Sequence, residues 1–300
     1  MKEEKKQGVF FVALSYILWG CLPVFWKLLD HVPSFYVLCA RVVWSVVFCL
    51  FYLTILGKWK RIREIWQDKK IVLRCGLCGV VVCMNWGGYI WGVNSGHLID
   101  CSFGYYLNPI LVVLLGVFFF QEKLAGEEWL AVILAAFGVG YLIVRSGTVP
   151  VLAVLVGGSF AIYGMMKKGL SIRSDESLFL ETLLVSPAAL VYMIVKEIQG
   201  TGAGGVLKGQ EWLLLPLAGI ITAVPLLIYS AGVKMIPFYL AGILMYLNPT
   251  IQFLMGVFLY KEKIDADKFV SFAFIWAGIL VMLIYSIRMN KRKGKSRGQG

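Results

Sequence analysis

The sequence predicts an all-α integral membrane protein whose ten transmembrane helices form two inverted five-helix repeats. Three observations favour this fold. First, 59% of the 300 residues are apolar and only 15% are charged, which is too little polar surface to cover a soluble globule. Second, the apolar residues fall into ten runs of about 20 residues, the length of a helix that crosses a bilayer. Third, one polar motif set inside an apolar run occurs twice.

The ten runs are separated by short polar or charged segments. Strings such as ILVVLLGVFFF lack the alternation of apolar and polar residues that a membrane β-barrel strand has, so helices are expected. In chain order, the expected spans cover residues 8–27, 36–56, 71–92, 98–120, 128–145, 149–166, 178–196, 212–233, 238–260 and 267–287.

The repeated motif indicates an internal duplication. The segments GYYLNPILVVLLGVFFFQEKL (104–124) and LMYLNPTIQFLMGVFLYKEKI (244–264) lie 140 residues apart and are identical at ten of 21 positions. The identities include Asn, Pro, Glu and Lys, which a shared apolar composition does not align. We therefore expect one repeat over 1–145, a second over 146–287 and a basic cytoplasmic tail over 288–300. Because each repeat has five spans, an odd number, the second enters the membrane in the opposite sense.

The distribution of lysine and arginine predicts the orientation of the chain. With the N-terminus in the cytoplasm, 21 of the 29 basic residues fall in inside segments, seven fall outside and Arg41 lies within a span. Both termini are therefore expected in the cytoplasm. The formal charge of +12 is attributed to this sorting of basic residues to the cytoplasmic side, and no nucleic acid partner is expected. In particular, KWKRIREIWQDKK (58–70) has the helical spacing of an interfacial helix on anionic headgroups.

Two ionisable side chains within spans are the first candidates for a functional site, since such groups are costly in a bilayer and usually face a cavity or a partner. Arg41 and Glu181 occupy similar depths of the second and seventh spans and are related by the same offset of 140. We expect Arg41 to recognise an anionic substrate group or to pair with Glu181, and Glu181 to accept a coupling proton. A structural ion pair and an interfacial arginine are the alternatives.

Further polar residues are candidates for a substrate pathway. Asn85 and Tyr89 lie four residues apart on one face of the third span, where they would line a cavity or form interhelical hydrogen bonds. Tyr163 of the sixth span is a third candidate for the lining.

The two Asn-Pro pairs are expected to disturb their helices. Pro109 and Pro249 lack the N–H that a helix interior needs, and their rings crowd the preceding turn, so each is expected to act as a kink or hinge. Asn108 and Asn248 carry amides that would satisfy the freed backbone groups or contact substrate.

Signatures of catalysis or metal binding are missing from the sequence. Cys75 and Cys78 have CxxC spacing, but no second pair or nearby histidine completes a site. A P-loop, a GxSxG motif and an HExxH motif are also absent. We expect no enzymatic activity, no metal and no cofactor apart from a coupling proton.

The motifs together resemble the drug/metabolite transporter superfamily, within it the EamA family, and most closely the RarD-type permeases. The resemblance covers essentially the whole chain, from ALSYILWGCLPVFWKLL through NWGGYIWGVNSGH and GYYLNP to MYLNPTIQFLMGVFLYKEK. It implies a ten-helix permease of the bacterial inner membrane that moves a small metabolite or an amphiphilic drug-like compound.

The function expected from the resemblance and the inverted repeat is secondary active transport by alternating access. The alternative is a channel or a non-transporting regulatory membrane protein. The substrate, coupling to protons and assembly into a homodimer are left open by the sequence.

Overall fold

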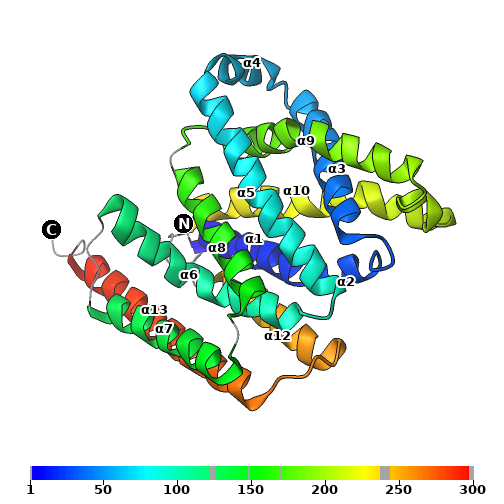
Figure 1. Cartoon of the computed structure of the whole chain (residues 1–300). Coiled ribbons are helices and arrows are strands. Elements are labelled where there is room, and N and C mark those ends of the chain that lie inside the picture. Colours follow the sequence, from blue (N-terminus) through cyan, green and yellow to red (C-terminus); the bar gives the residue numbers. More distant parts are fainter. Residues whose placement is uncertain (1, 122–125, 148, 169, 237–243, 297–300) are drawn as a thin grey trace.

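The computed structural model describes residues 2–121, 126–147, 149–168, 170–236 and 244–296, and these residues form helices and turns but no strand (Figure 1). The first half contains α1 (Lys2–Gly20), α2 (Leu22–Lys27), α3 (Ser34–Ile55), α4 (Trp59–Gln67), α5 (Lys69–Asn94), α6 (Leu98–Phe120) and α7 (Gly126–Ser146). The second half contains α8 (Val151–Lys168), α9 (Ser174–Ile198), α10 (Leu214–Gly232), α12 (Leu247–Leu254), a π-helical turn (Met255–Leu259) and α13 (Ala266–Ser296).

Several of these helices are long and apolar enough to cross a membrane, so the chain is a multi-pass membrane protein. Six spans in the described part of the chain meet this description: Glu3–Lys27, Ser34–Ile55, Lys69–Asn94, Trp129–Ser146, Ser174–Gly205 and Gly209–Tyr229. The bent helix α6 makes a seventh if its two arms are one span. Two shorter apolar helices, Val151–Lys167 and Leu247–Leu259, reach only about 20–26 Å at 1.5 Å per residue, less than the hydrocarbon core of about 30 Å.

The two Asn-Pro sites have different backbone structures. Helix α6 bends by 40° between Leu98–Asn108 and Ile110–Phe119, and Pro109 is the residue at the bend. Pro249 instead lies in the first turn of α12, directly after a turn at residues 245–246. The N–H that proline lacks is there one that a helix start leaves unpaired in any case. The expected continuous helix over 238–260 is therefore interrupted before Pro249, while residues 237–243 lie outside the described residues.

Helices α3 and α9 pack against each other in antiparallel directions. Near the start of α3, the hydroxyl of Tyr36 donates a hydrogen bond of 2.6 Å to Glu197 near the end of α9. Just beyond the end of α3, Lys58 forms an ion pair with Asp175 in the first turn of α9. The N-terminal half of each helix thus lies beside the C-terminal half of the other, which determines which polar residues meet.

Two buried clusters form most of the core. The larger joins α2, α3, α5, α6, α8 and α10 and includes the fully buried Trp26 and Ile90. The second joins α6, α7, α8 and α13 around Phe103 and Phe272, whose rings meet edge to face at 5.0 Å. Large apolar side chains such as Phe118 remain exposed outside these clusters, as expected of helices that face lipid.

Helix α4 is the short helix expected between the second and third spans. Its apolar residues Ile62 and Ile65 are buried, whereas its charged residues are exposed. The ring of Trp59 meets Phe179 edge to face at 5.8 Å, so α4 is attached to α9. Contact of its basic face with lipid headgroups stays a prediction.

Positions that are 140 residues apart make reciprocal contacts. Tyr106 stacks on Tyr246, with ring centroids 6.5 Å apart. A Cβ atom at Gly138 would lie 2.9 Å from the carbonyl oxygen of Ser271, and a Cβ atom at Gly278 would lie 2.9 Å from that of Ala131. The offset of 140 makes Gly278 the equivalent of Gly138 and Ser271 the equivalent of Ala131. The interface of α7 with α13 therefore places equivalent glycines against equivalent backbone carbonyls.

Candidate functional site

The buried guanidinium of Arg41 lies between two indole rings. Only 4% of Arg41 is exposed, and its central carbon lies 3.9 Å from the ring centroid of Trp86 on α5 and 5.1 Å from that of Trp26 on α2. Such cation–π contacts stabilise a desolvated cation. Among the described residues, however, no carboxylate pairs with Arg41, and its Nε has no hydrogen-bond partner. The site therefore carries one positive charge without a counter-ion.

Two tyrosines and an asparagine lie beside this arginine. The rings of Tyr89 and Tyr105 meet edge to face at 5.7 Å, and both side chains are close enough to Arg41 to interact with its charge. Tyr105 donates a hydrogen bond of 3.3 Å to Asn85 Oδ1, whose Nδ2 donates at 2.7 Å to the carbonyl of Val156 on α8. Asn85 therefore ties α5 to α8, whereas the buried hydroxyl of Tyr89 has no partner in the described part of the chain.

The asparagines of the two Asn-Pro pairs form structural hydrogen bonds. Asn108 Nδ2 donates at 3.2 Å to the carbonyl of Gly157 on α8. Asn248 Oδ1 accepts a hydrogen bond of 2.6 Å from Gln252 one turn further along α12. Asn108 thus joins α6 to α8 near the bend, and Asn248 belongs to a pair within its own helix.

A second buried polar cluster surrounds Glu181, which is fully buried. Its carboxylate accepts hydrogen bonds of 2.8 Å from Tyr163 and from Lys167 on α8, and a further one from Ser177 on α9. Lys167 neutralises the charge of Glu181. Sequence reasoning missed Lys167, although its position four residues after Tyr163 in FAIYGMMKK places both on one helix face.

The expected pairing of Arg41 with Glu181 is wrong, because Glu181 pairs with Lys167 instead. The antiparallel register of α3 on α9 gives the physical reason. The residue after Arg41 packs with Ala189, whereas Glu181 lies near Cys49. Eight residues (41 to 49) separate these two levels, about 12 Å along a helix axis. Arg41 and Glu181 therefore lie in opposite halves of the helix pair, at different levels along its axis.

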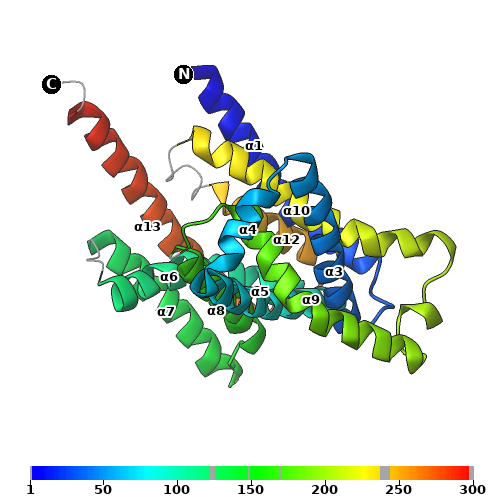
Figure 2. The ribbon, with the colours of Figure 1, turned by 90° about the horizontal axis from the view of Figure 1, so that it is seen from above.

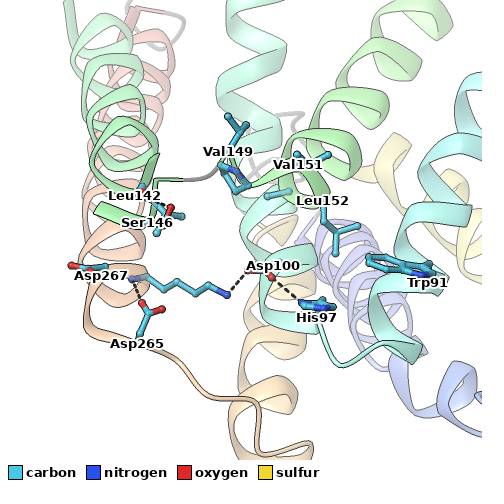
Figure 3. Close-up of a pocket in the computed structure, with 13 residues that line it drawn as sticks. Trp91, His97, Asp100, Leu142, Ser146, Val149, Val151, Leu152, Asp265 and Asp267 are labelled. Atoms are coloured by element: carbon cyan, nitrogen blue, oxygen red, sulfur yellow. Dashed lines mark hydrogen bonds and ion pairs between the residues drawn. The ribbon is translucent and has the colours of Figure 1, made fainter. Parts of the chain in front are cut away.

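Two cavities lie elsewhere between the helices, the first of them beside the helix turn that follows Arg41. An apolar groove of about 520 Å³ runs between α3, α5, α8 and α9 and is lined by residues such as Val42 and Cys83. A more polar cavity of about 330 Å³ lies where α13 begins, against α5, α6, α7 and α8 (Figure 3). There Asp100 pairs with Lys268 at 2.9 Å and with His97 at 3.3 Å, so α6 is linked to α13.

Asp267 at the same end of α13 holds α7 through two hydrogen bonds, one of 2.8 Å from Tyr141 and one of 3.0 Å from Arg145. These bonds from the Tyr141 hydroxyl and the Arg145 guanidinium lower the pKa of Asp267.

The lowered pKa of Asp267 predicts a pH-dependent stability. The pKa of Asp267 in the folded state lies below its unfolded value of about 3.9. The stability that ionised Asp267 contributes is therefore fully present above about pH 3.9, and it is lost as the pH falls through the folded-state pKa. We expect Asp267→Asn to have a lower Tm than the wild type at neutral pH, and the gap to close in acid. Thermal unfolding of both proteins from neutral to acid pH measures this difference in Tm. A difference that is constant with pH would contradict the lowered pKa of Asp267.

Glu262, which follows the repeated motif, caps a helix of the first half. Its two carboxylate oxygens accept hydrogen bonds of 2.8 and 2.9 Å from the backbone N–H groups of Leu98 and Ile99, at the start of α6. A carboxylate at this end also complements the helix dipole. The equivalent Glu122 lies outside the described residues.

Metal and cofactor binding gain no support from this geometry. Within the described ranges, no group of three or more His, Cys, Asp or Glu side chains is arranged to hold a metal ion. The prediction that the protein uses neither a metal nor an organic cofactor stays a prediction.

Known proteins resemble the chain over its whole length. The sequence profile of the EamA-like transporter family matches residues 6–144 and again residues 148–284. The chain is 40% identical to Uncharacterized transporter YojE of Bacillus subtilis (strain 168), over 98% of each protein. It is 33% identical to Protein RarD of Escherichia coli (strain K12), over 98% of this chain and 99% of that protein. It is 27% identical to Chloramphenicol-sensitive protein RarD of Pseudomonas aeruginosa, over 96% of this chain and 97% of that protein.

A protein of known crystal structure shares the fold. The two structures superpose with a TM-score of 0.62 at 16% sequence identity, over 94% of this chain and 99% of the other. At this identity the likeness concerns the fold alone.

Proposed function

Because the chain belongs to the EamA-like transporter family, we propose that it is a secondary active transporter. It moves a small metabolite or an amphiphilic drug-like compound across the bacterial cytoplasmic membrane by alternating access. The observation that carries the proposal is the double match of one family profile to the two halves of the chain, 6–144 and 148–284. Two similar halves that exchange conformations give an inward-open and an outward-open state around one site.

The packing of the helices supports a ten-helix inverted repeat. The offset of 140 makes α8 the equivalent of α1, α9 that of α3 and α10 that of α5. Exchanging each helix with its equivalent converts the contact of α1 with α10 into that of α8 with α5, and both contacts are present. The same exchange relates the contact of α3 with α10 to that of α5 with α9. In addition, α1 begins and α13 ends on the same side of the molecule (Figure 2). This arrangement supports the proposal that both termini lie on one side of the membrane, and the distribution of lysine and arginine favours the cytoplasmic side.

Arg41 and Glu181 are the proposed working parts. Arg41 with Tyr89 forms the part that recognises substrate, since no carboxylate among the described residues pairs with the charge of Arg41. Glu181, bonded to Tyr163 and Lys167, is the acceptor of a coupling proton, since proton relays in membrane transporters use buried carboxylates. The bend at Pro109 is the proposed hinge.

A counter-flow screen tests the function. Purified protein in proteoliposomes is loaded with an unlabelled compound, and uptake of the same labelled compound is followed for a panel of metabolites and chloramphenicol. A transporter gives saturable uptake that is stimulated by the compound inside, with or without a pH gradient. Flux without counter-flow would show a channel, and no flux for any compound would favour a regulatory protein.

The inverted topology has its own test, because it places equivalent residues on opposite sides of the membrane. In a variant without native cysteines, Lys123→Cys is expected to react with reagents from the cytoplasm and Lys263→Cys from the outside. Reaction of both from one side would refute the inversion.

A further inference from the structure

Four polar atoms without partners gather around Arg41. Within the described residues, Trp26 Nε1, Arg41 Nε, Ser45 Oγ and the hydroxyl of Tyr89 are buried and form no hydrogen bond. All four residues are nine-tenths buried or more. Trp26 and Tyr89 belong to one packed cluster, and Ser45 lies one turn after Arg41 on α3. Buried polar atoms are normally paired, so four in one place indicate that a binding partner belongs there.

The chemistry of these atoms specifies the missing partner. Indole and guanidinium nitrogens only donate hydrogen bonds, and the two hydroxyls can donate as well. The group that satisfies them must therefore be an acceptor. Unpaired buried donors and an uncompensated buried charge, such as that of Arg41, each cost free energy. An acceptor with one negative charge removes both costs, because it pairs with the donors and balances the charge. A carboxylate meets this requirement, because its two oxygens can accept two parallel hydrogen bonds from the planar guanidinium group.

We propose that this site binds an organic monoanion, a carboxylate attached to a flat aromatic or unsaturated group. The inference rests on the proposed transport function and narrows its substrate class. The indoles of Trp26 and Trp86 and the phenols of Tyr89 and Tyr105 provide aromatic surface on which a flat group packs.

The charges nearby argue for a single negative charge. Lys167 is already paired with Glu181. Lys27, the neighbour of Trp26, donates a hydrogen bond of 3.3 Å to the carbonyl of Asn94 and lies over the ring of Tyr260. Among the described residues, Arg41 is therefore the buried cation whose charge a ligand would balance, whereas a neutral compound would leave that charge uncompensated.

Equilibrium binding to the purified protein tests the inference. The probes are para-nitrobenzoate, para-nitrobenzamide and para-nitrobenzylamine, which differ in charge and quench tryptophan fluorescence; cinnamate with its amide forms a second pair. We expect each carboxylate to bind about tenfold or more tightly than its amide, which corresponds to about 1.4 kcal/mol, and the amine to bind no better than the amide. Equal affinity for acid and amide, or no binding of either carboxylate, would overturn the proposal.

Variants separate recognition from a structural role. Arg41→Met is expected to abolish the preference for carboxylate and to raise the Tm of the ligand-free protein, because it removes an uncompensated buried charge. Arg41→Lys keeps the charge without the fork, so the preference should remain at lower affinity. Arg63→Met, the matched change at an exposed arginine of α4, should alter neither quantity.

Two outcomes would identify Arg41 as structural and overturn the inference. One is a lowered Tm of ligand-free Arg41→Met, and the other is unchanged binding of para-nitrobenzoate to that variant. The binding measurement needs no flux, so a failure of counter-flow would reject the transport proposal and leave the anion site in place. Conversely, counter-flow of neutral compounds without carboxylate binding would reject the anion site alone.

Discussion

Lys167→Met is expected to lower the free energy of unfolding by about 3–5 kcal/mol, the usual cost of breaking a buried ion pair by removing one partner. The carboxylate of Glu181 is fully buried, so water does not replace the lost cation. The hydroxyls of Tyr163 and Ser177 still donate to it but carry no charge. Denaturant unfolding in detergent micelles measures the loss, and Lys60→Met at an exposed position of α4 is the control.

The double variant Lys167→Met, Glu181→Gln completes the test. An amide keeps hydrogen-bonding capacity without charge, so the double variant should recover most of the stability that Lys167→Met loses, and the cycle should show a coupling energy above about 1 kcal/mol. Additive losses would mean that the pair is not an energetic unit. Glu181→Gln alone should keep counter-flow exchange and lose dependence on a pH gradient. A gradient-driven uptake that survives this change would remove Glu181 as the proton acceptor.

Gly157→Leu is expected to destabilise the protein by about 3 kcal/mol or more, the upper range for overpacking. A Cβ atom at Gly157 would collide with the backbone carbonyl oxygen of Gly104 on α6. A backbone atom cannot rotate away, so α8 would have to move from α6 and stretch the hydrogen bond from Asn108 to the Gly157 carbonyl. Close approach through small residues is a common way for membrane helices to associate.

The neighbouring glycine provides a matched control. A Cβ atom at Gly158 would meet nothing within 4 Å, so Gly158→Leu tests the same change on the same helix without the collision. The Tm of this variant should stay close to that of the wild type, while that of Gly157→Leu falls. Equal losses at both positions would show that leucine disturbs α8 for reasons unrelated to its crossing with α6.

The positions of most helices were predictable because apolar runs and their charged ends are local signals. The second span was expected over 36–56 and lies at Ser34–Ile55, and the helix at Trp59–Gln67 follows the basic spacing of its segment. The interruption before Pro249 was not predictable from the motif, because the same Tyr-Leu-Asn-Pro sequence is compatible with a bent helix and with a helix start.

The environment of Arg41 shows why the site was only partly predictable. A charge in an apolar run is visible in the sequence, so Arg41 and Glu181 could both be singled out. Their partners come from other helices, and nothing local indicates that Trp26 and Trp86 enclose Arg41 or that Lys167 meets Glu181. The offset of 140 was a misleading guide to contact, since it relates equivalent positions and does not bring them together.

The capping of α6 by Glu262 has a consequence for how the sequence can vary. Its two hydrogen-bond donors are backbone N–H groups, at Leu98 and Ile99, and every residue except proline supplies such a donor. Those two positions can therefore accept many side chains as far as this contact is concerned, whereas position 262 needs a carboxylate of suitable reach. The ion pair of Asp100 with Lys268 in the same turn of α6 depends instead on a side chain from each half. The contact made by Glu262 is thus encoded on one half alone, and substitutions at positions 98 and 99 other than proline leave its two donors in place.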